Sequence, residues 1–227
     1  MTEPKLSYTP FDYANLTAKW LLEIGAVEYC ADPPFTWTSG RSSPIYVDVR
    51  KILGARYRAR AEINAMSCNK LYETVEKIDL VTGGETAGIP FATMIAERMM
   101  KPLGYVRKKP KEFGRNAQIE CFSDEQLAAN KKILLVEDLC SDGGSKKVFV
   151  DAIRRSGNVI TDVFAVFSYG CFGAAAALAQ EGVRLIHLTD ALTLINVADD
   201  LDWSTAETRD EIRRFLAAPN AWKLEAA

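Results

Sequence analysis

The sequence predicts an α/β fold: a mostly parallel sheet flanked by helices, with a small hood formed by the two chain ends. Short apolar runs of strand length alternate along the chain with segments whose apolar residues recur at helical spacing. Strands joined by helices run parallel, because each connecting helix returns the chain to the same end of the sheet. Ligands of such sheets bind at the carboxyl ends of the strands, where candidate residues are therefore sought.

The expected elements follow the chain in order. Helices are expected over 12–25, 56–73, 88–100, 144–156, 172–181 and 204–217. Strands are expected over 77–81, 104–107, 132–136, 159–167 and 184–188. Gly83 and Gly84 are expected to form a turn, and 108–118 a loop, because that stretch lacks periodicity and contains proline and glycine. Residues 31–47, rich in proline, serine, threonine and aromatic residues, are expected to form turns and short strands.

All 227 residues are expected to form one domain. Its core is expected over about 55–170 and its cap from residues 1–54 and 171–227. The tryptophans are expected to be packing residues: Trp20, Trp37, Trp203 and Trp222. Asp48 and Arg50 are expected to form an internal ion pair.

The composition excludes several classes of protein. Hydrophobic residues make up 48% and charged residues 26% of the chain, an ordinary globular balance. A net charge of −2 argues against general nucleic-acid binding. The apolar runs are too short to span a bilayer, and the N-terminus lacks the pattern of a signal peptide. The five cysteines show neither close pairing nor metal-ligand spacing, which favours a reducing compartment, the cytoplasm.

An acidic pair marks the most informative segment. The apolar strand at 132–136 runs into Glu137 and Asp138, and a turn of small residues and a helix follow. Two carboxylates are unsuited to a phosphate, but they suit a neighbouring pair of hydroxyl groups such as those of ribose.

The turn after the acidic pair is suited to a phosphate. Gly143 and Gly144 let the backbone approach an anion closely. The hydroxyls of Ser141 and Ser145 and the N-terminus of the next helix can hold a phosphate. The segment lacks the G-K-[ST] of a P-loop and the glycine spacing of the dinucleotide fingerprint. Together with the acidic pair, the turn predicts a sugar-phosphate site.

A basic stretch lies between two predicted strands. Residues 107–115 carry five cations against the single carboxylate Glu112, five minus one, or +4. Such a local patch on a mildly acidic chain indicates a small anionic ligand.

The segment 133–145 resembles the signature with which type I phosphoribosyltransferases bind 5-phosphoribosyl 1-pyrophosphate (PRPP). Residues 35–46 resemble the N-terminal signature of orotate phosphoribosyltransferases, 84–90 their second loop, 106–114 their mobile catalytic loop and 116–120 the stretch after it. The order of these motifs is also that of the family. The resemblance implies a type I phosphoribosyltransferase-like fold and transfer of the phosphoribosyl group of PRPP to orotate. The products would be orotidine 5′-monophosphate and pyrophosphate, in pyrimidine biosynthesis.

The resemblance also implies roles for individual residues. Lys111 would be the catalytic lysine. PRPP would be bound by Arg107, Lys108, Lys111, Glu137, Asp138, Leu139, Cys140, Ser141, Asp142, Gly143, Gly144 and Ser145. Orotate would contact Ser141. Tyr46 is interpreted either as a second orotate contact or as a core aromatic residue.

A cofactor and a partner follow from the same resemblance. Mg²⁺ would be held by oxygens of PRPP and its sugar hydroxyls, without a metal cage made by the protein alone. A homodimer is implied, with the loop 107–118 shared across subunits.

Three positions depart from the family pattern. Phe113 stands where the catalytic loop usually has histidine, and Thr38 and Ala87 stand where some relatives have lysine. The single histidine, His187, lies in a predicted strand and is expected to be structural. Histidine-based proton transfer is therefore not expected in the loop.

Three other functions remain open at this stage. The chain could be a phosphoribosyltransferase for another base, a PRPP-sensing regulator that lacks catalysis, or a sugar-phosphate-binding protein of unrelated chemistry. The intact Lys111 loop argues against the regulator, and the order of the motifs argues against unrelated chemistry.

Overall fold

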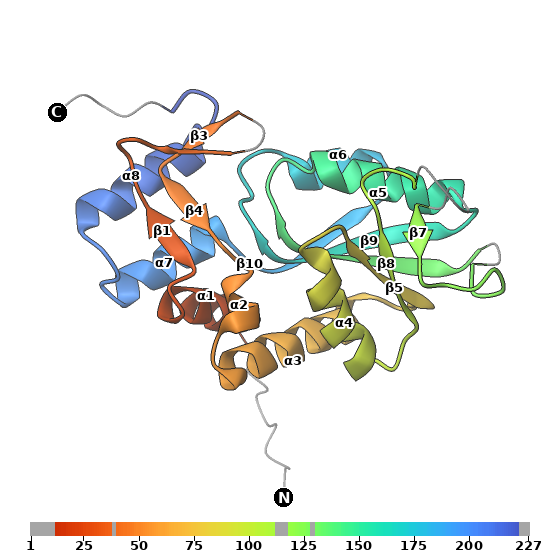
Figure 1. Ribbon diagram of the computed structural model, residues 1–227. Coiled ribbons are helices and arrows are strands. Elements are labelled where there is room, and N and C mark those ends of the chain that lie inside the picture. The colour runs from red at the N-terminus through yellow and green to blue at the C-terminus, as the bar shows by residue number, and fades with distance from the viewer. Residues whose placement is uncertain (1–11, 38–39, 112–117, 128–129, 223–227) are drawn as a thin grey trace, which may run out of the picture.

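The computed structural model describes residues 12–37, 40–111, 118–127 and 130–222. Within these residues, six strands form the central sheet in the order β10-β9-β8-β5-β6-β7 (Figure 1). The strands are β5 Leu80–Gly84, β6 Leu103–Val106, β7 Ile119–Glu120, β8 Lys132–Cys140, β9 Val159–Ser168 and β10 Arg184–Asp190. Neighbouring strands pair in parallel except β7, which is antiparallel to β6. The predicted mostly parallel sheet is confirmed.

The strand order creates a switch point in the sheet. From β5 the chain crosses to β6 on one side, and β8, β9 and β10 are then added on the other side. Loops that leave neighbouring strands in opposite directions open a crevice at the carboxyl ends of β5 and β8. A ligand is therefore expected beside these two strand ends.

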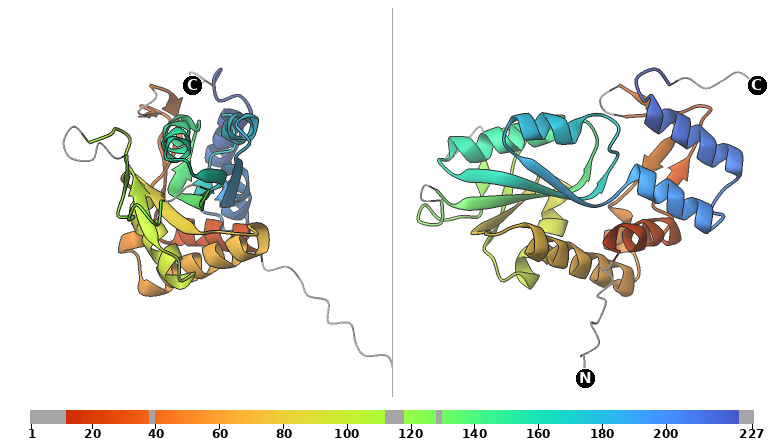
Figure 2. Two further views of the ribbon diagram at one scale, coloured as in Figure 1. Left: turned by 90° about the vertical axis from the view of Figure 1, so that its right-hand side faces the viewer. Right: turned by 180° about the vertical axis from the view of Figure 1, so that it is seen from behind.

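Helices cover both faces of the sheet, as Figure 2 shows. The helices that flank the sheet are α3 Tyr57–Thr74, α4 Gly88–Arg98, α5 Gly144–Arg155 and α6 Ala174–Gln180. Buried residues of α3 and α4 pack with Val81, Leu134 and Val136. On the other face, Phe149 of α5 packs with Ile133 and Leu135. Alternate residues of β8 thus serve two separate cores, as the pleat of a strand requires.

The two chain ends form a cap beside the sheet (Figure 1). Its elements are α1 Tyr13–Glu23, β1 Val27–Tyr29, β2 Phe35–Thr36, β3 Ser42–Ser43, β4 Ile45–Val47, α2 Lys51–Gly54, α7 Ala191–Asp200 and α8 Ala206–Ala217. Trp37 joins the cap to the sheet, because its ring lies 4.5 Å from that of Tyr169, directly after β9. The Tyr169 hydroxyl also accepts a hydrogen bond of 3.1 Å from the Val47 amide.

Most expected elements are present with ends shifted by a few residues, but four expectations need correction. The acidic pair lies inside β8 and not after it, because parallel pairing with β9 continues to Cys140. Gly83 and Gly84 are the last residues of β5, so the turn there begins at Glu85. The helix Ala191–Asp200 was missed. The sheet also extends beyond the range 55–170, because β10 is one of its edge strands.

The expected packing roles of the tryptophans are confirmed, since each is partly buried against the main core. No helix of the described part of the chain is both long and apolar enough to cross a bilayer.

Candidate active site

Glycines bring the ends of β5 and β8 into close contact. A Cβ atom at Gly84 would lie 1.7 Å from Oε1 of Glu137. At Gly88, which begins α4, a Cβ would lie 2.4 Å from the carbonyl oxygen of Val136. The second loop of the sequence motif is therefore packed directly against the acidic pair, and glycine is required at both positions.

The two adjacent carboxylates lie on opposite faces of β8. Glu137 follows Ile133 and Leu135 on the face covered by α5, and Asp138 follows Leu134 and Val136 on the other face. Both residues are buried, with 6% and 8% of their surface exposed. The sequence did not show this separation, because it depends on the strand continuing past residue 136.

Lys146 is the partner of Glu137. Its ammonium lies 3.3 Å from Oε2 of Glu137, and both side chains are more than nine-tenths buried. Oε1 of Glu137 has no hydrogen-bond partner in the described structure. Burial raises the pKa of Glu137 to about 7, and the Lys146 ammonium limits that rise. Burial also raises the pKa of Asp138, opposed by the amide of Leu139, by Lys146 and by Arg50.

Sequence reasoning missed Lys146, although a signal was present. Lys146, Phe149, Val150 and Ile153 recur at i, i+3, i+4 and i+7, and all four are buried. This lysine lies on the apolar face of a predicted helix, and the helix is joined by a short turn to the strand that carries two carboxylates. That pattern predicts a buried ion pair.

The turn before α5 contains a left-handed glycine. Gly143 has φ +83°, a left-handed conformation that favours glycine. The amide of Gly144 donates to Oδ1 of Asp142 over 3.1 Å, so this N–H is already engaged. Ser141 is half-buried beside the turn. The side chain of Ser145 lies outside the described residues.

Cys140 and Leu139 complete the strand end. Cys140 is fully buried and packs with Ala165 and Ala174. Its full burial indicates a packing residue, and the same burial raises the pKa of its thiol to about 11. Leu139 is half-buried.

The basic stretch begins at the end of β6 and is tied to the loop after β5. The amide of Lys108 donates to Oε2 of Glu85 over 2.8 Å. The amide of Arg107 donates to the carbonyl of Gln118 over 2.8 Å. Both residues therefore lie at the carboxyl end of β6, with Lys108 beside the loop after β5. Lys109 is exposed.

Lys111 does not lie beside the acidic pair. Its ammonium lies 2.7 Å from Oε1 of Glu120 on β7, and Arg107 lies 3.8 Å from the same oxygen. Three strand spacings separate β7 from β8, or roughly 14 Å at about 4.8 Å each. Phe113 and Arg115 of this loop, like Thr38 in the N-terminal motif, lie outside the described residues.

Tyr46 lies in β4 of the cap, half-buried and 5.6 Å from the ring of Phe35. Its hydroxyl accepts a hydrogen bond from Arg50, and Arg50 pairs with Asp48 over 2.7 Å. The expected ion pair of Asp48 and Arg50 is thus confirmed. Arg50 is also one of the groups that oppose the rise of the Asp138 pKa on burial.

His187 lies in β10, where its Nε2 is 3.6 Å from Oδ2 of Asp190. Asp190 in turn caps α7 by accepting a hydrogen bond from the Thr193 amide. These contacts fit the structural role expected for the histidine.

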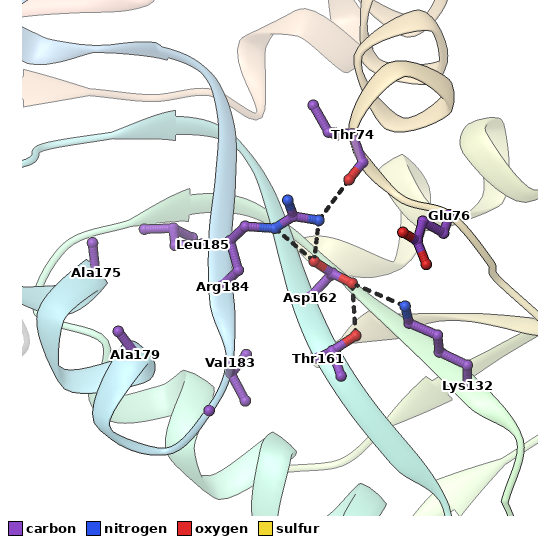
Figure 3. A pocket seen from close by; sticks show the side chains of 11 residues that line it. Thr74, Glu76, Lys132, Thr161, Asp162, Ala175, Ala179, Val183, Arg184 and Leu185 are labelled. Carbon is purple, nitrogen blue, oxygen red and sulfur yellow. Dashed lines mark hydrogen bonds and ion pairs between the residues drawn. The ribbon is translucent and has the colours of Figure 1, made fainter.

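A cavity of about 590 Å³ lies near the amino ends of β8, β9 and β10 (Figure 3). Asp162 lies at its centre, 2.7 Å from Arg184 and 3.7 Å from Lys132. The charged groups in this cavity neutralise one another. The acidic pair and the glycine turn lie at the other end of the strands, the carboxyl end. We do not assign the candidate site to this cavity.

The described residues contain no group of three or more histidine, cysteine or acidic side chains that could hold a metal ion. A metal at the candidate site would need oxygens from its ligand.

Comparison with known proteins places this site in a family. A family model described as "Phosphoribosyl transferase domain" matches residues 56–165, which includes the acidic pair and the glycine turn. The fold and site thus define a phosphoribosyltransferase. The orotate phosphoribosyltransferase of Jannaschia sp. (strain CCS1) is 43% identical over 213 residues, covering 92% of this chain and 91% of that protein. The chain belongs to the orotate phosphoribosyltransferase family.

Solved structures agree with this assignment. The orotate phosphoribosyltransferase from Aeropyrum pernix aligns with a TM-score of 0.67 and 27% identity, covering 83% of this chain and 99% of that one. The Mycobacterium tuberculosis H37Rv enzyme in complex with PRPP aligns with a TM-score of 0.60 and 26% identity, covering 81% of this chain and 98% of that one.

Proposed function

We propose that the protein transfers the phosphoribosyl group of PRPP to orotate, giving orotidine 5′-monophosphate and pyrophosphate in pyrimidine biosynthesis. The observation that carries this proposal is the 43% identity to an orotate phosphoribosyltransferase over almost the whole chain. The geometry supports it, because the acidic pair and the glycine turn lie at the carboxyl end of β8, and Arg107 and Lys108 follow the carboxyl end of β6 beside the loop after β5.

The turn at 141–144 would hold the 5-phosphate of PRPP. The left-handed Gly143 brings backbone N–H groups to the N-terminus of α5, where the helix dipole favours an anion. Glu137 and Asp138 would accept hydrogen bonds from the ribose hydroxyls, directly or after a change of side-chain orientation.

The basic residues would stabilise the leaving group. When a ring nitrogen of the base attacks the anomeric carbon of the sugar, the bond to pyrophosphate breaks and negative charge grows on pyrophosphate. Arg107 and Lys108 lie beside the loop after β5 and would neutralise part of that charge. Lys111 would contribute only after leaving Glu120, so its movement is part of the catalytic cycle.

Mg²⁺ would reach the site bound to PRPP. It would neutralise charge on the pyrophosphate oxygens. The basic stretch and the sugar-binding carboxylates would then hold the complex from two sides.

A homodimer would share the segment 107–118 between subunits, as the family resemblance implies. We place the protein in the cytoplasm, where the substrates of a biosynthetic phosphoribosyl transfer occur. The five free cysteines suit that reducing compartment.

The absorbance of orotate tests the proposal. We expect the absorbance to fall only when protein, PRPP and Mg²⁺ are all present. Lys111→Ala should abolish turnover, while Lys109→Ala, which alters a neighbouring exposed lysine, should retain it.

The outcome separates the alternatives. A protein that binds PRPP in calorimetry, but turns over no base with or without Lys111, would be a sensor and would overturn the proposal.

A further inference from the structure

Lys146 is a buried cation that the proposed mechanism has not used. It lies in the first turn of α5, the helix that follows the phosphate turn, with 7% of its surface exposed. The next residue, Lys147, has a side chain that is 57% exposed and pairs with Glu181 at the protein surface. Removing an ammonium group from water is costly unless a partner compensates it, so the burial of Lys146 requires an explanation.

Its partner lies on the strand that carries the acidic pair. Nζ of Lys146 is 3.3 Å from Oε2 of Glu137, while Oε1 of Glu137 occupies the space left by the missing side chain of Gly84. One ion pair therefore connects α5, β8 and the end of β5. Of these elements, α5 and β8 would hold the phosphate and the ribose.

We propose that Lys146 is a positioning residue for phosphoribosyl transfer, an inference that rests on the proposed function. It holds Glu137 in place as a carboxylate and fixes the phosphate turn against the end of β5. Lys146 acts through Glu137 and does not itself touch the substrate.

The charges around Glu137 determine what the loss of Lys146 would do to its ionisation. Lys146 of α5 and Lys108 after β6 favour its ionised form, while Asp138 beside it on β8 opposes ionisation. The nearest cation is Lys146, and its loss would leave a buried carboxylate without a close partner. Because burial already raises the pKa of Glu137 to about 7, losing this ammonium would raise that pKa further and favour the neutral form.

The test is the pH dependence of kcat/KM for PRPP in Lys146→Met, with Lys147→Met as the matched control. We expect the acid limb of the profile to move upward by about one pH unit or more in Lys146→Met. Lys146→Arg should restore most of the wild-type profile. Lys147→Met should leave the profile unchanged.

A second pair of variants covers the case in which Lys146→Met does not fold. Glu137→Gln and the double variant Glu137→Gln with Lys146→Met both remove the titrating carboxylate. Because Lys146 acts through Glu137, adding Lys146→Met to Glu137→Gln should change kcat/KM by less than about threefold at every pH.

The outcomes are distinguishable. A Lys146→Met profile that is lowered equally at every pH would overturn the inference, because it would indicate a direct substrate contact or a structural role. If the wild-type protein neither binds PRPP in calorimetry nor turns over orotate, the proposed function fails instead.

Discussion

Lys111 and Glu120 form an ion pair in which Nζ lies 2.7 Å from Oε1 and 2.9 Å from Oε2. The lysine side chain is 44% exposed and the carboxylate 15%. This pair holds Lys111, the lysine proposed to be catalytic, at the edge strand β7 and not at the acidic pair. In the proposed mechanism, the pair must therefore break before Lys111 can engage pyrophosphate.

Glu120→Gln should make Lys111 easier to engage. An ion pair with a partly exposed lysine contributes about 0.5–1 kcal/mol, so its loss should lower KM for PRPP by roughly two- to fivefold. Steady-state kinetics at saturating orotate measure this, with Glu125→Gln in an exposed turn as the control. A KM that stays constant or rises in Glu120→Gln would show that the pair does not restrain Lys111.

Gly84→Ala should damage both the site and the fold. Its Cβ would meet Oε1 of Glu137 at 1.7 Å and the Phe149 ring at 2.7 Å, so the carboxylate must move. We expect kcat/KM to fall ~100-fold and the free energy of unfolding to fall by about 1–3 kcal/mol. Gly54→Ala is the control, because a Cβ there meets nothing within 4 Å. Activity within twofold of the wild type in Gly84→Ala would contradict the proposed contact.

Tyr169→Phe should loosen the cap. The hydroxyl accepts a buried hydrogen bond from the Val47 amide, and its removal leaves that N–H unpaired. The expected cost is about 1–3 kcal/mol; about 2 kcal/mol would lower Tm by roughly 4–8 °C in a chain of this size. Calorimetric unfolding tests this, with Tyr57→Phe as the control because Tyr57 is 76% exposed. An unchanged Tm would mean that water replaces the hydroxyl at no cost.

The sequence predicted the sheet well because its strands are apolar runs between helices with clear periodicity. The length of β8 was not predictable in this way. Glu137 and Asp138 read as the end of a strand, yet pairing with β9 continues through Cys140. Helix α7 was missed despite the pattern of Leu194, Ile195 and Ala198 after the capping Asp190.

The site was predictable in part. The glycine turn and the acidic pair occur together in the sequence, and the fold places them at the switch point. The arrangement of their charges was not predictable, because it depends on which face of a strand or helix each residue occupies. Lys146 reaches Glu137 across α5 and β8, and Lys111 reaches Glu120 across the loop from β6 to β7.

The most direct test of the central claim is a competition among bases. Orotate, uracil, adenine and hypoxanthine are supplied together with PRPP, Mg²⁺ and the wild-type protein, and mass spectrometry identifies the nucleotides formed. We predict orotidine 5′-monophosphate as the product, released together with pyrophosphate. A nucleotide of another base, or no nucleotide while PRPP still binds, would contradict the assignment.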